Sequence, residues 1–306
     1  MNKFKQLLFF KSIKRVGKVK IHDNYLSLLN EYGDLDDLIM IMESKFGFRL
    51  NVLEEAKDKA EKLYDLIINE RDIEVITIFD DNYPKKLKIM GNKAPLILYV
   101  KGNVDALSKP SLAVIGTRKP SDLSMEFEKE LVKSVIDTTD RVIVSGLALG
   151  CDKIAHKVTV DEDKSTIAIL PSGVNVITPA SNKKLAQSIL ETGGCLVSEY
   201  EPNAKAFKST YVERDQIVAA FSDATFVVEC GVKSGTMHTV NAAQKFNRQI
   251  FAYLPNNLNN SSYDGNKFIL ENNNDAIKVE SQNDFLNDLN NLNIEINRSY
   301  GQQKLM

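Results

Sequence analysis

Four short segments combine glycine with serine or threonine, a pattern that can bind phosphate. They are Gly116–Arg118, Ser145–Ala148, Ser172–Gly173 and Ser234–Thr236, and each follows a short apolar run. Glycine lets the backbone approach a ligand closely, hydroxyl groups donate hydrogen bonds, and the N-terminus of a following helix presents unsatisfied amides. One such turn is explained by tight packing between a strand and a helix. Four turns in one sheet favour a pocket for an anion, in particular a phosphate group.

Other chemistries find less support in the residue types. The three cysteines lie far apart in the sequence, and none of the three histidines has a ligand-like spacing to a cysteine or another histidine, so we expect neither a disulfide framework nor a metal site. The chain has no GxGxxG fingerprint followed by an acidic residue and no GxxxxGK[ST] loop, which argues against NAD-linked chemistry and against NTP hydrolysis, and we expect no cofactor. Asp152 and His156 could form an acid–base pair. No nucleophile with matching spacing accompanies them, so a structural role at a helix start is the favoured interpretation.

Apolar runs that alternate with helix-length segments predict the sheet that would position these turns. The expected strands are 75–79, 96–100, 112–115, 142–144, 166–170, 195–198, 225–228 and 250–254. Continuous apolar runs separated by helices indicate a mostly parallel sheet with helices on both faces, so the predicted fold class is α/β and Rossmann-like. In such a sheet the glycine turns share the carboxyl edge, where ligands bind near the switch point of the strand order.

The first 75 residues follow another pattern. Their apolar residues recur at helical spacing, as in the series Tyr25, Leu28, Leu29 and Tyr32, and predict a small all-helical domain of the helix–hairpin–helix or SAM type. The segment Arg15–Lys20 could be a hairpin whose glycine approaches a phosphate, or an ordinary helix connector. We therefore predict domains at 1–75 and 76–290. The Asn-rich end, 291–306, is predicted to be a tail.

The overall charge argues for a local binding patch. The formal net charge is −2 and the pI is near 6.0, so no global positive field would attract a polyanion. Lysines gather in the first 20 residues and acidic residues in 256–296, which solvated surface explains most simply. The apolar run Leu7–Phe10 is too short for a signal sequence or a membrane span, so we expect a cytoplasmic protein without membrane association.

An ordered series of motifs resembles the DprA/Smf (DNA-processing protein A) family. It includes Ala113-Val-Ile-Gly-Thr-Arg118, Ser145-Gly-Leu-Ala148, Ser234-Gly-Thr236 and Arg248-Gln-Ile-Phe-Ala252, and it covers roughly residues 70–290. The resemblance implies a helical N-terminal domain and a Rossmann-like domain that binds single-stranded DNA and forms a homodimer. It also implies that the strand is protected and passed to a RecA-type recombinase during DNA uptake and recombination, without catalytic turnover.

The resemblance also implies which residues contact the DNA and the second subunit. Lysines and arginines would contact phosphates beside the glycine turns, and Phe268 and Ile269 would be apolar anchors of the dimer, although both could instead be core residues. The expected DNA-contacting residues are Gly116, Thr117, Arg118, Ser145, Gly146, Gly173, Asn182, Lys183, Lys208, Arg214, Ser234, Gly235 and Thr236.

The chain departs from the family pattern at several positions. The family usually has Phe-Pro-x-Arg-Asn-Arg-Ile, whereas this chain has Tyr211-Val-Glu-Arg-Asp-Gln-Ile217, with Gln216 in place of the second arginine. Leu149 stands where an arginine is common, and Ser124 and Asn256 stand where glycine is typical. Because two cations are lost, we expect the affinity or the ligand to differ from those of relatives.

Two other functions stay open at this point. A sensor of the same superfamily would hold a free nucleotide in the phosphate turns and would not need Lys183 and Lys208. A nucleoside-monophosphate phosphoribohydrolase-like enzyme would place a Gly-Thr-x-x-Glu segment at the nucleotide. This chain has Gly235-Thr-Met-His-Thr239 there, which lacks the carboxylate.

Overall fold

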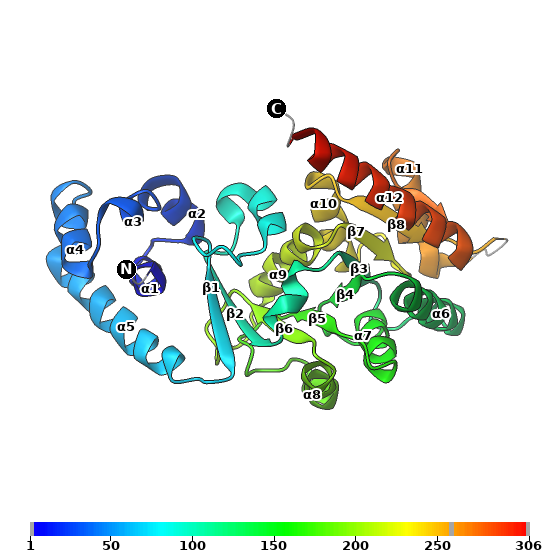
Figure 1. The fold of residues 1–306 in the computed structure, drawn as a ribbon, viewed down its shortest axis with the longest axis horizontal. Coiled ribbons are helices and arrows are strands. Elements are labelled where there is room, and N and C mark those ends of the chain that lie inside the picture. Colours follow the sequence, from blue (N-terminus) through cyan, green and yellow to red (C-terminus); the bar gives the residue numbers. More distant parts are fainter. Residues whose placement is uncertain (1–2, 257–259, 304–306) are drawn as a thin grey trace.

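The computed structural model describes residues 3–256 and 260–303, which build a mostly parallel sheet with helices on both faces (Figure 1). The nine strands of this described part are β1 (Ile73–Thr77), β2 (Ile97–Gly102), β3 (Ser111–Ile115), β4 (Val142–Ser145), β5 (Thr166–Ile169), β6 (Cys195–Ser198), β7 (Ala224–Val227), β8 (Gln249–Tyr253) and β9 (Ile277–Val279). Their order is β1-β2-β6-β5-β4-β3-β7-β8-β9. The pairs β1–β2 and β2–β6 are antiparallel and all others parallel. The predicted α/β fold class is confirmed.

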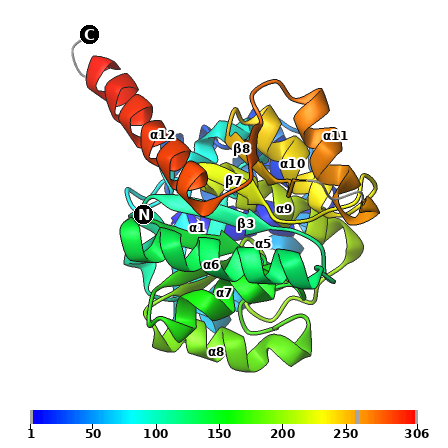
Figure 2. The same ribbon diagram turned by 90° about the vertical axis from the view of Figure 1, so that its right-hand side faces the viewer.

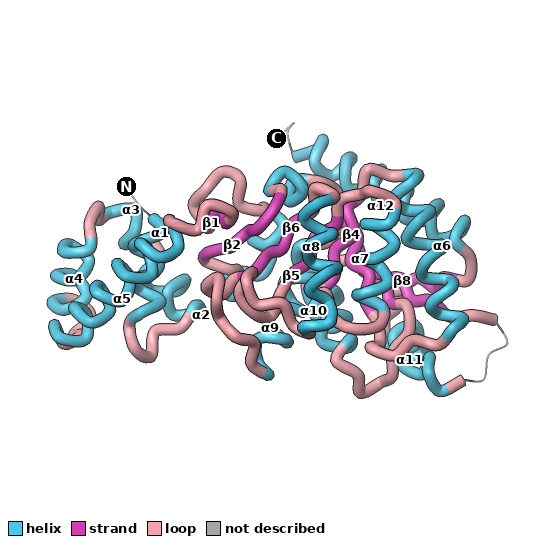
Figure 3. Tube along the Cα trace, turned by 90° about the horizontal axis from the view of Figure 1, so that it is seen from below, coloured by secondary structure: helices cyan, strands magenta, loops and turns pink. Residues whose placement is uncertain are grey.

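Side chains of the central strands alternate between two buried layers. In β3, Leu112 and Val114 belong to one apolar cluster and Ala113 and Ile115 to the other, as the period of a strand requires. The first layer lies under α6 (Asp122–Thr138), α7 (Cys151–Asp161) and α12 (Gln282–Gln303). The second lies under α9 (Lys208–Phe221) and α10 (Thr236–Lys245). Figure 3 shows α6, α7 and α8 (Lys183–Glu191) side by side on one face.

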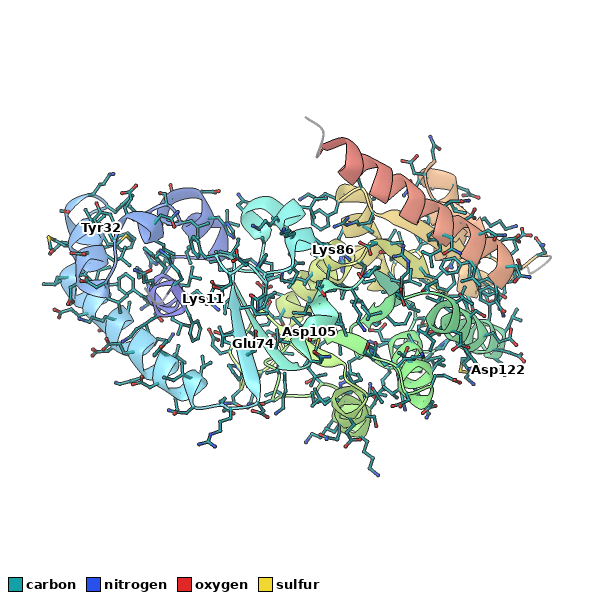
Figure 4. The ribbon with its side chains drawn as sticks, in the orientation of Figure 1. Lys11, Tyr32, Glu74, Lys86, Asp105 and Asp122 are labelled. Carbon is teal, nitrogen blue, oxygen red and sulfur yellow. The ribbon has the colours of Figure 1, made fainter. Side chains whose placement is uncertain are left out.

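The N-terminal helices pack against the antiparallel end of the sheet. They are α1 (Lys3–Ser12), α2 (Lys18–Lys20), a π-helical turn (Ile21–Tyr25), α3 (Leu28–Glu31), α4 (Leu35–Ser44) and α5 (Leu50–Ile68). Their apolar side chains share one buried cluster with Tyr99 of β2 and Ile189 of α8. Lys11, on the side of α1 that faces the sheet in Figure 4, forms an ion pair with Glu201. The helical content is as predicted, and the domain boundary at residue 75 stays a prediction.

The remaining helical elements are short, and the described part of the chain ends in the long helix α12. The short elements are η2 (Lys85–Lys93), η3 (Val104–Ser108), η4 (Ala180–Asn182), η5 (Ser261–Tyr263) and α11 (Asp264–Asn272). The residues predicted as a tail from 291 continue α12 as far as Gln303, and the end of this helix projects beyond the body of the molecule (Figure 2). Phe285 and Leu289, one helical turn apart, anchor its first half in the core. Within the described residues, no helix is long and apolar enough to cross a membrane.

Candidate functional site

The main polar pocket lies where the strand order changes direction. The strands β3 and β7 are neighbours, and the loops that follow them diverge at the carboxyl edge of the sheet. A pocket of about 540 Å³ opens there, as expected at the switch point of a doubly wound sheet. It is lined by Ile115, Gly116, Thr117, Arg118, Gly146, Ala148, Asp152, Lys208, Tyr211, Val212, Arg214, Asp215, Val218, Ser234, Gly235, Thr236, His238 and Thr239.

Glycine occupies the four predicted turns for different physical reasons. A Cβ atom on Gly116 would lie 2.4 Å from the sulfur of Cys151, and one on Gly146 would lie 1.2 Å from Nη1 of Arg214. A Cβ atom on Gly173 would lie 2.0 Å from the carbonyl oxygen of Glu201. Internal packing therefore explains these three glycines. At Gly146 the atoms in the way are the end of the Arg214 side chain, which its contacts with Asp215 and Ile169 hold in place. A Cβ atom on Gly235 would meet nothing within 4 Å, so the fold does not require glycine there.

Gly235 precedes helix α10 and lies in the wall of the pocket. No side chain caps this helix end. The first amides of a helix carry a partial positive charge. The amides of Met237 and His238 already donate to the carbonyl oxygens of Ser234 and Gly235 at 3.2 and 2.9 Å, so among the described residues the amides of Gly235 and Thr236 are the ones left for a ligand. A phosphate can therefore approach the backbone at Gly235 without meeting a side chain, and Thr236 lines the pocket beside it. The hydroxyl oxygen of Ser234 is instead buried next to the thiol of Cys230.

Arg214 forms a buried support for the pocket wall. It is 5% exposed, its Nε lies 3.0 Å from Oδ1 of Asp215, and its Nη1 donates to the carbonyl oxygen of Ile169 at 3.2 Å. Nη1 also lies 3.9 Å from Oδ2 of Asp152. Burial raises the pKa of both aspartates, and the guanidinium opposes this rise. The charge of Arg214 is thus largely balanced by its acidic neighbours, which distinguishes it from an exposed phosphate ligand.

Two cations at the pocket are exposed. Arg118 follows β3 and Lys208 begins α9, and neither forms an ion pair with another described residue. A smaller cavity of about 210 Å³ adjoins the pocket and shares Arg118, Tyr211 and Arg214 with it, and it extends to Pro179. The pocket therefore continues along the carboxyl edge toward the start of α8.

Lys183 lies at that end of the edge, outside the main pocket. It is exposed at the first residue of α8. The preceding residue, Asn182, is buried, and its Nδ2 donates to the carbonyl oxygens of Leu147 and Ala148 at 2.9 and 3.2 Å. Asn182 therefore attaches the start of α8 to the loop after β4. This contact positions Lys183 but leaves the Asn182 amide group engaged inside the protein.

Three residues predicted to contact a ligand or a partner are used inside the fold. Ser145 is fully buried and its Oγ donates to the carbonyl oxygen of Val114 at 2.7 Å, so its hydroxyl group braces β4 against β3. Gly173 packs against the 201–204 loop and does not line the pocket. Ile269 is 2% exposed and belongs to the core, whereas Phe268 beside it is 42% exposed.

The predicted set lacked several residues that line the pocket. Tyr211 and Asp215 follow Lys208 at intervals of three and four residues on α9, and His238 lies in the first turn of α10. Residues three or four apart share one face of a helix. This spacing would have predicted Tyr211, three residues after Lys208, and then Asp215, four residues after Tyr211.

The Asp152–His156 pair has a structural role. Oδ2 of Asp152 accepts hydrogen bonds from the amides of Gly146 and Ala148 and so shapes the loop after β4. His156 is fully buried, with Nδ1 2.9 Å from Oγ1 of Thr166. Burial, with a smaller effect of Arg214, lowers the pKa of His156 to about 3, so the ring is neutral. These contacts agree with the structural interpretation of the pair.

Of the four family departures, Leu149 is the one at the site. It is 42% exposed and lines the smaller cavity. Gln216 instead faces a separate cavity near Lys18 and Lys93, so the exchange at 216 does not remove a cation from the main pocket. Ser124 is buried beneath Tyr263, and Asn256 donates to Glu280 at the surface.

The fold and the pocket define a Rossmann-like α/β protein with a polar site at the switch point of its sheet. The model of the family described as DNA recombination-mediator protein A matches residues 74–290, and the chain belongs to this family. The resemblance derived from the sequence motifs is therefore confirmed.

Individual relatives agree with this assignment. Protein Smf of Borreliella burgdorferi is 30% identical over 81% of this chain and 78% of its own length. The structure of DNA processing protein A from Streptococcus pneumoniae has a TM-score of 0.76 at 26% identity, and the match covers 94% of this chain and 97% of that one. The sequence match covers 65% of the same pneumococcal protein's length. DNA processing protein A from Helicobacter pylori, whose structure addresses its single-stranded DNA binding mode, has a TM-score of 0.63 at 32% identity, covering 71% of this chain and 95% of that one.

Proposed function

We propose that this chain binds single-stranded DNA as a recombination mediator, protects the strand and passes it to a RecA-type recombinase. The observation that carries the proposal is the pair of exposed cations Arg118 and Lys208, which form no ion pair with the described residues, at a pocket whose Gly235 is open to a ligand. Charged groups left unpaired beside unsatisfied helix amides suit a phosphodiester.

The extent of the site favours a strand over a single phosphate. The edge from α10 to the start of α8 passes the ends of β7, β3, β4 and β5. Three spacings between neighbouring strands amount to about 14 Å. Lys183 at the far end would have no part in holding one small anion at Gly235. A row of cations of this length suits successive phosphates of one strand.

Tyr211 provides a surface for the bases. It lines both cavities, together with the exposed Arg118 and with Gly146 and Ala148 of the loop after β4. Aromatic side chains bind single strands by stacking on bases, and this contact has little sequence preference. Phosphates carry no base identity either. We therefore propose weak sequence preference.

A free nucleotide is the second candidate ligand, because a pocket of about 540 Å³ is large enough for a small molecule. The enzyme alternative has less support. The carboxylates at the pocket, Asp152 and Asp215, are paired with Arg214, and Thr239 stands where the phosphoribohydrolase pattern has glutamate. We propose that binding involves no catalytic turnover, no cofactor and no metal.

The test compares three ligands at two salt concentrations. Labelled oligo-dT is titrated with the protein by fluorescence anisotropy, and duplex DNA of equal length and a mixture of nucleotides serve as competitors. The proposal predicts that unlabelled oligo-dT competes strongly, duplex DNA weakly and free nucleotides least. Strong competition by nucleotides with weak binding of oligo-dT would instead support the nucleotide sensor.

We propose a cytoplasmic homodimer that uses the exposed Phe268 on α11, since Ile269 is already part of the core. The predicted interaction with a RecA-type recombinase rests on the family alone.

A further inference from the structure

The segment that leads into α9 carries an exposed aromatic ring between two cations. Phe207 is 68% exposed, although phenylalanine usually packs inside. Lys205 and Lys208 on either side are exposed, and neither forms an ion pair within the described part of the chain. Packing inside the protein therefore does not explain why this ring lies at the surface.

The backbone around Phe207 is held firmly. Its amide donates to Oγ1 of Thr210 at 3.0 Å, and that hydroxyl donates to the Phe207 carbonyl oxygen at 2.9 Å. The preceding loop is attached to the loop after β5, because the amide of Gly173 donates to the carbonyl oxygen of Ala204 at 2.9 Å. The ring is thus presented from a fixed backbone, which lowers the entropic cost of binding.

Phe207 lies close to the proposed DNA site. Tyr211, which lines both cavities, comes four residues later, in the first turn of the helix that Phe207 precedes as its N-cap residue. The two rings do not contact each other, as neither takes part in a ring pair among the described residues. Each ring therefore keeps a face for a separate partner.

We infer that Phe207 stacks on a nucleobase of the bound strand just outside the pocket. The strand would continue past Tyr211 toward the loop after β6, with Lys205 and Lys208 near its phosphates. This inference rests on the proposed function, because it needs a single strand in the pocket. Exposed aromatic rings interleaved with cations are the surface that holds single strands without reading their sequence.

The chain contains no tryptophan, so one introduced tryptophan reports on its own surroundings. The test uses Phe207→Trp, with Leu66→Trp as a matched control, because Leu66 is also 68% exposed but lies on α5. Oligo-dT and an abasic oligonucleotide with the same number of phosphates are titrated. The fluorescence of Phe207→Trp should fall with oligo-dT and stay constant with the abasic strand, and Leu66→Trp should not respond to either.

A second variant measures affinity. Phe207→Ala should bind oligo-dT about 5-fold or more weakly than the parent, should bind the abasic strand equally well, and should keep the salt dependence of the parent. Phe207→Tyr should restore oligo-dT binding. Failure of the parent to bind oligo-dT would reject the proposed function. If the parent binds oligo-dT but the fluorescence of Phe207→Trp does not change, the role of Phe207 is rejected while the proposed function stands. The same holds if Phe207→Ala alters dimerisation only.

Discussion

Arg118, Lys208 and Arg214 carry the same charge near one pocket, yet the fold uses them differently. Arg214 is buried between Asp152 and Asp215, so its removal would leave two carboxylates without their cation. Arg118 and Lys208 are exposed and lack such partners within the described chain. The sequence motifs predicted all three residues as phosphate contacts, because residue type and order do not reveal which cation the protein itself neutralises. That distinction depends on acidic residues brought close by folding.

Removal of an exposed cation should weaken DNA binding without changing stability. Four contacts, from Arg118, Lys183, Lys208 and the helix amides at Gly235, predict a loss of affinity of about 50-fold between roughly 50 and 200 mM salt. Lys208→Ala should reduce the log–log slope by about 0.7 and leave the melting temperature unchanged. Lys164→Ala is the control, because Lys164 is exposed just before β5, at the opposite edge of the sheet. An unchanged slope in Lys208→Ala would contradict the proposed contact.

Alanine at two of the three pocket glycines should separate ligand binding from packing. Gly235→Ala should fold normally and bind oligo-dT about tenfold more weakly, because the added methyl group displaces a phosphate from the helix amides. Gly146→Ala should lower the free energy of unfolding by about 1–3 kcal/mol, since its methyl group overlaps Arg214. Thermal unfolding and anisotropy titrations measure both effects. Equal destabilisation by the two variants would contradict the assignment of Gly235 to ligand binding and of Gly146 to packing.

The elements were predictable to different degrees. The eight predicted strands lie within about two residues of the observed ones because buried parallel strands appear in the sequence as continuous apolar runs. The pattern of apolar runs did not predict β9, since Ile277–Val279 is only three residues long and contains a lysine. It predicted a tail where α12 continues, because few apolar residues follow Leu289. The packing reasons for Gly116 and Gly146 could not be predicted, as their contacts come from residues distant in sequence.

Helices α6 and α7 meet at a buried carboxyl group, and this contact should make stability depend on pH. Glu128 on α6 is fully buried, and burial, with a further contribution from Asp152, raises its pKa well above the ordinary 4.5. The protonated form therefore stabilises the fold fully below about pH 4.5, and this contribution is lost as the pH rises through the raised pKa. Glu128→Gln should keep the fold and remove this part of the pH dependence. Melting temperatures of both proteins across pH 4–9 provide the measurement, and parallel curves would contradict the assignment.

At the scale of the whole molecule, three of the seven cations in the first 20 residues form ion pairs within the described chain. Lys5, Lys11 and Lys18 form ion pairs with Glu61, Glu201 and Glu199. Two of these pairs join the helical unit to the loop after β6. Lys11 and Lys18 thus help to attach the helices to the sheet, a role that the sequence alone could not distinguish from solvated surface. The exposed cations at the carboxyl edge remain the better candidates for DNA contact.

Assembly should depend on the exposed face of α11. Phe268→Ala should raise the dissociation constant of the homodimer about 30-fold, the effect expected for one central apolar anchor. Light scattering over a range of concentrations measures this change, with Phe207→Ala as a control that removes another exposed ring. A parent protein that is monomeric at about 10 μM would contradict the dimer itself.

The overlap between Gly146 and Arg214 has a consequence for sequence variation. A side chain at position 146 and a guanidinium at position 214 would occupy the same space, because only 1.2 Å would separate their atoms. Neither position can change freely while the other stays the same. Among related chains, the two positions should therefore covary: a residue other than glycine at 146 should occur together with a smaller residue at 214. In such chains Asp152 and Asp215 should also have lost their charge.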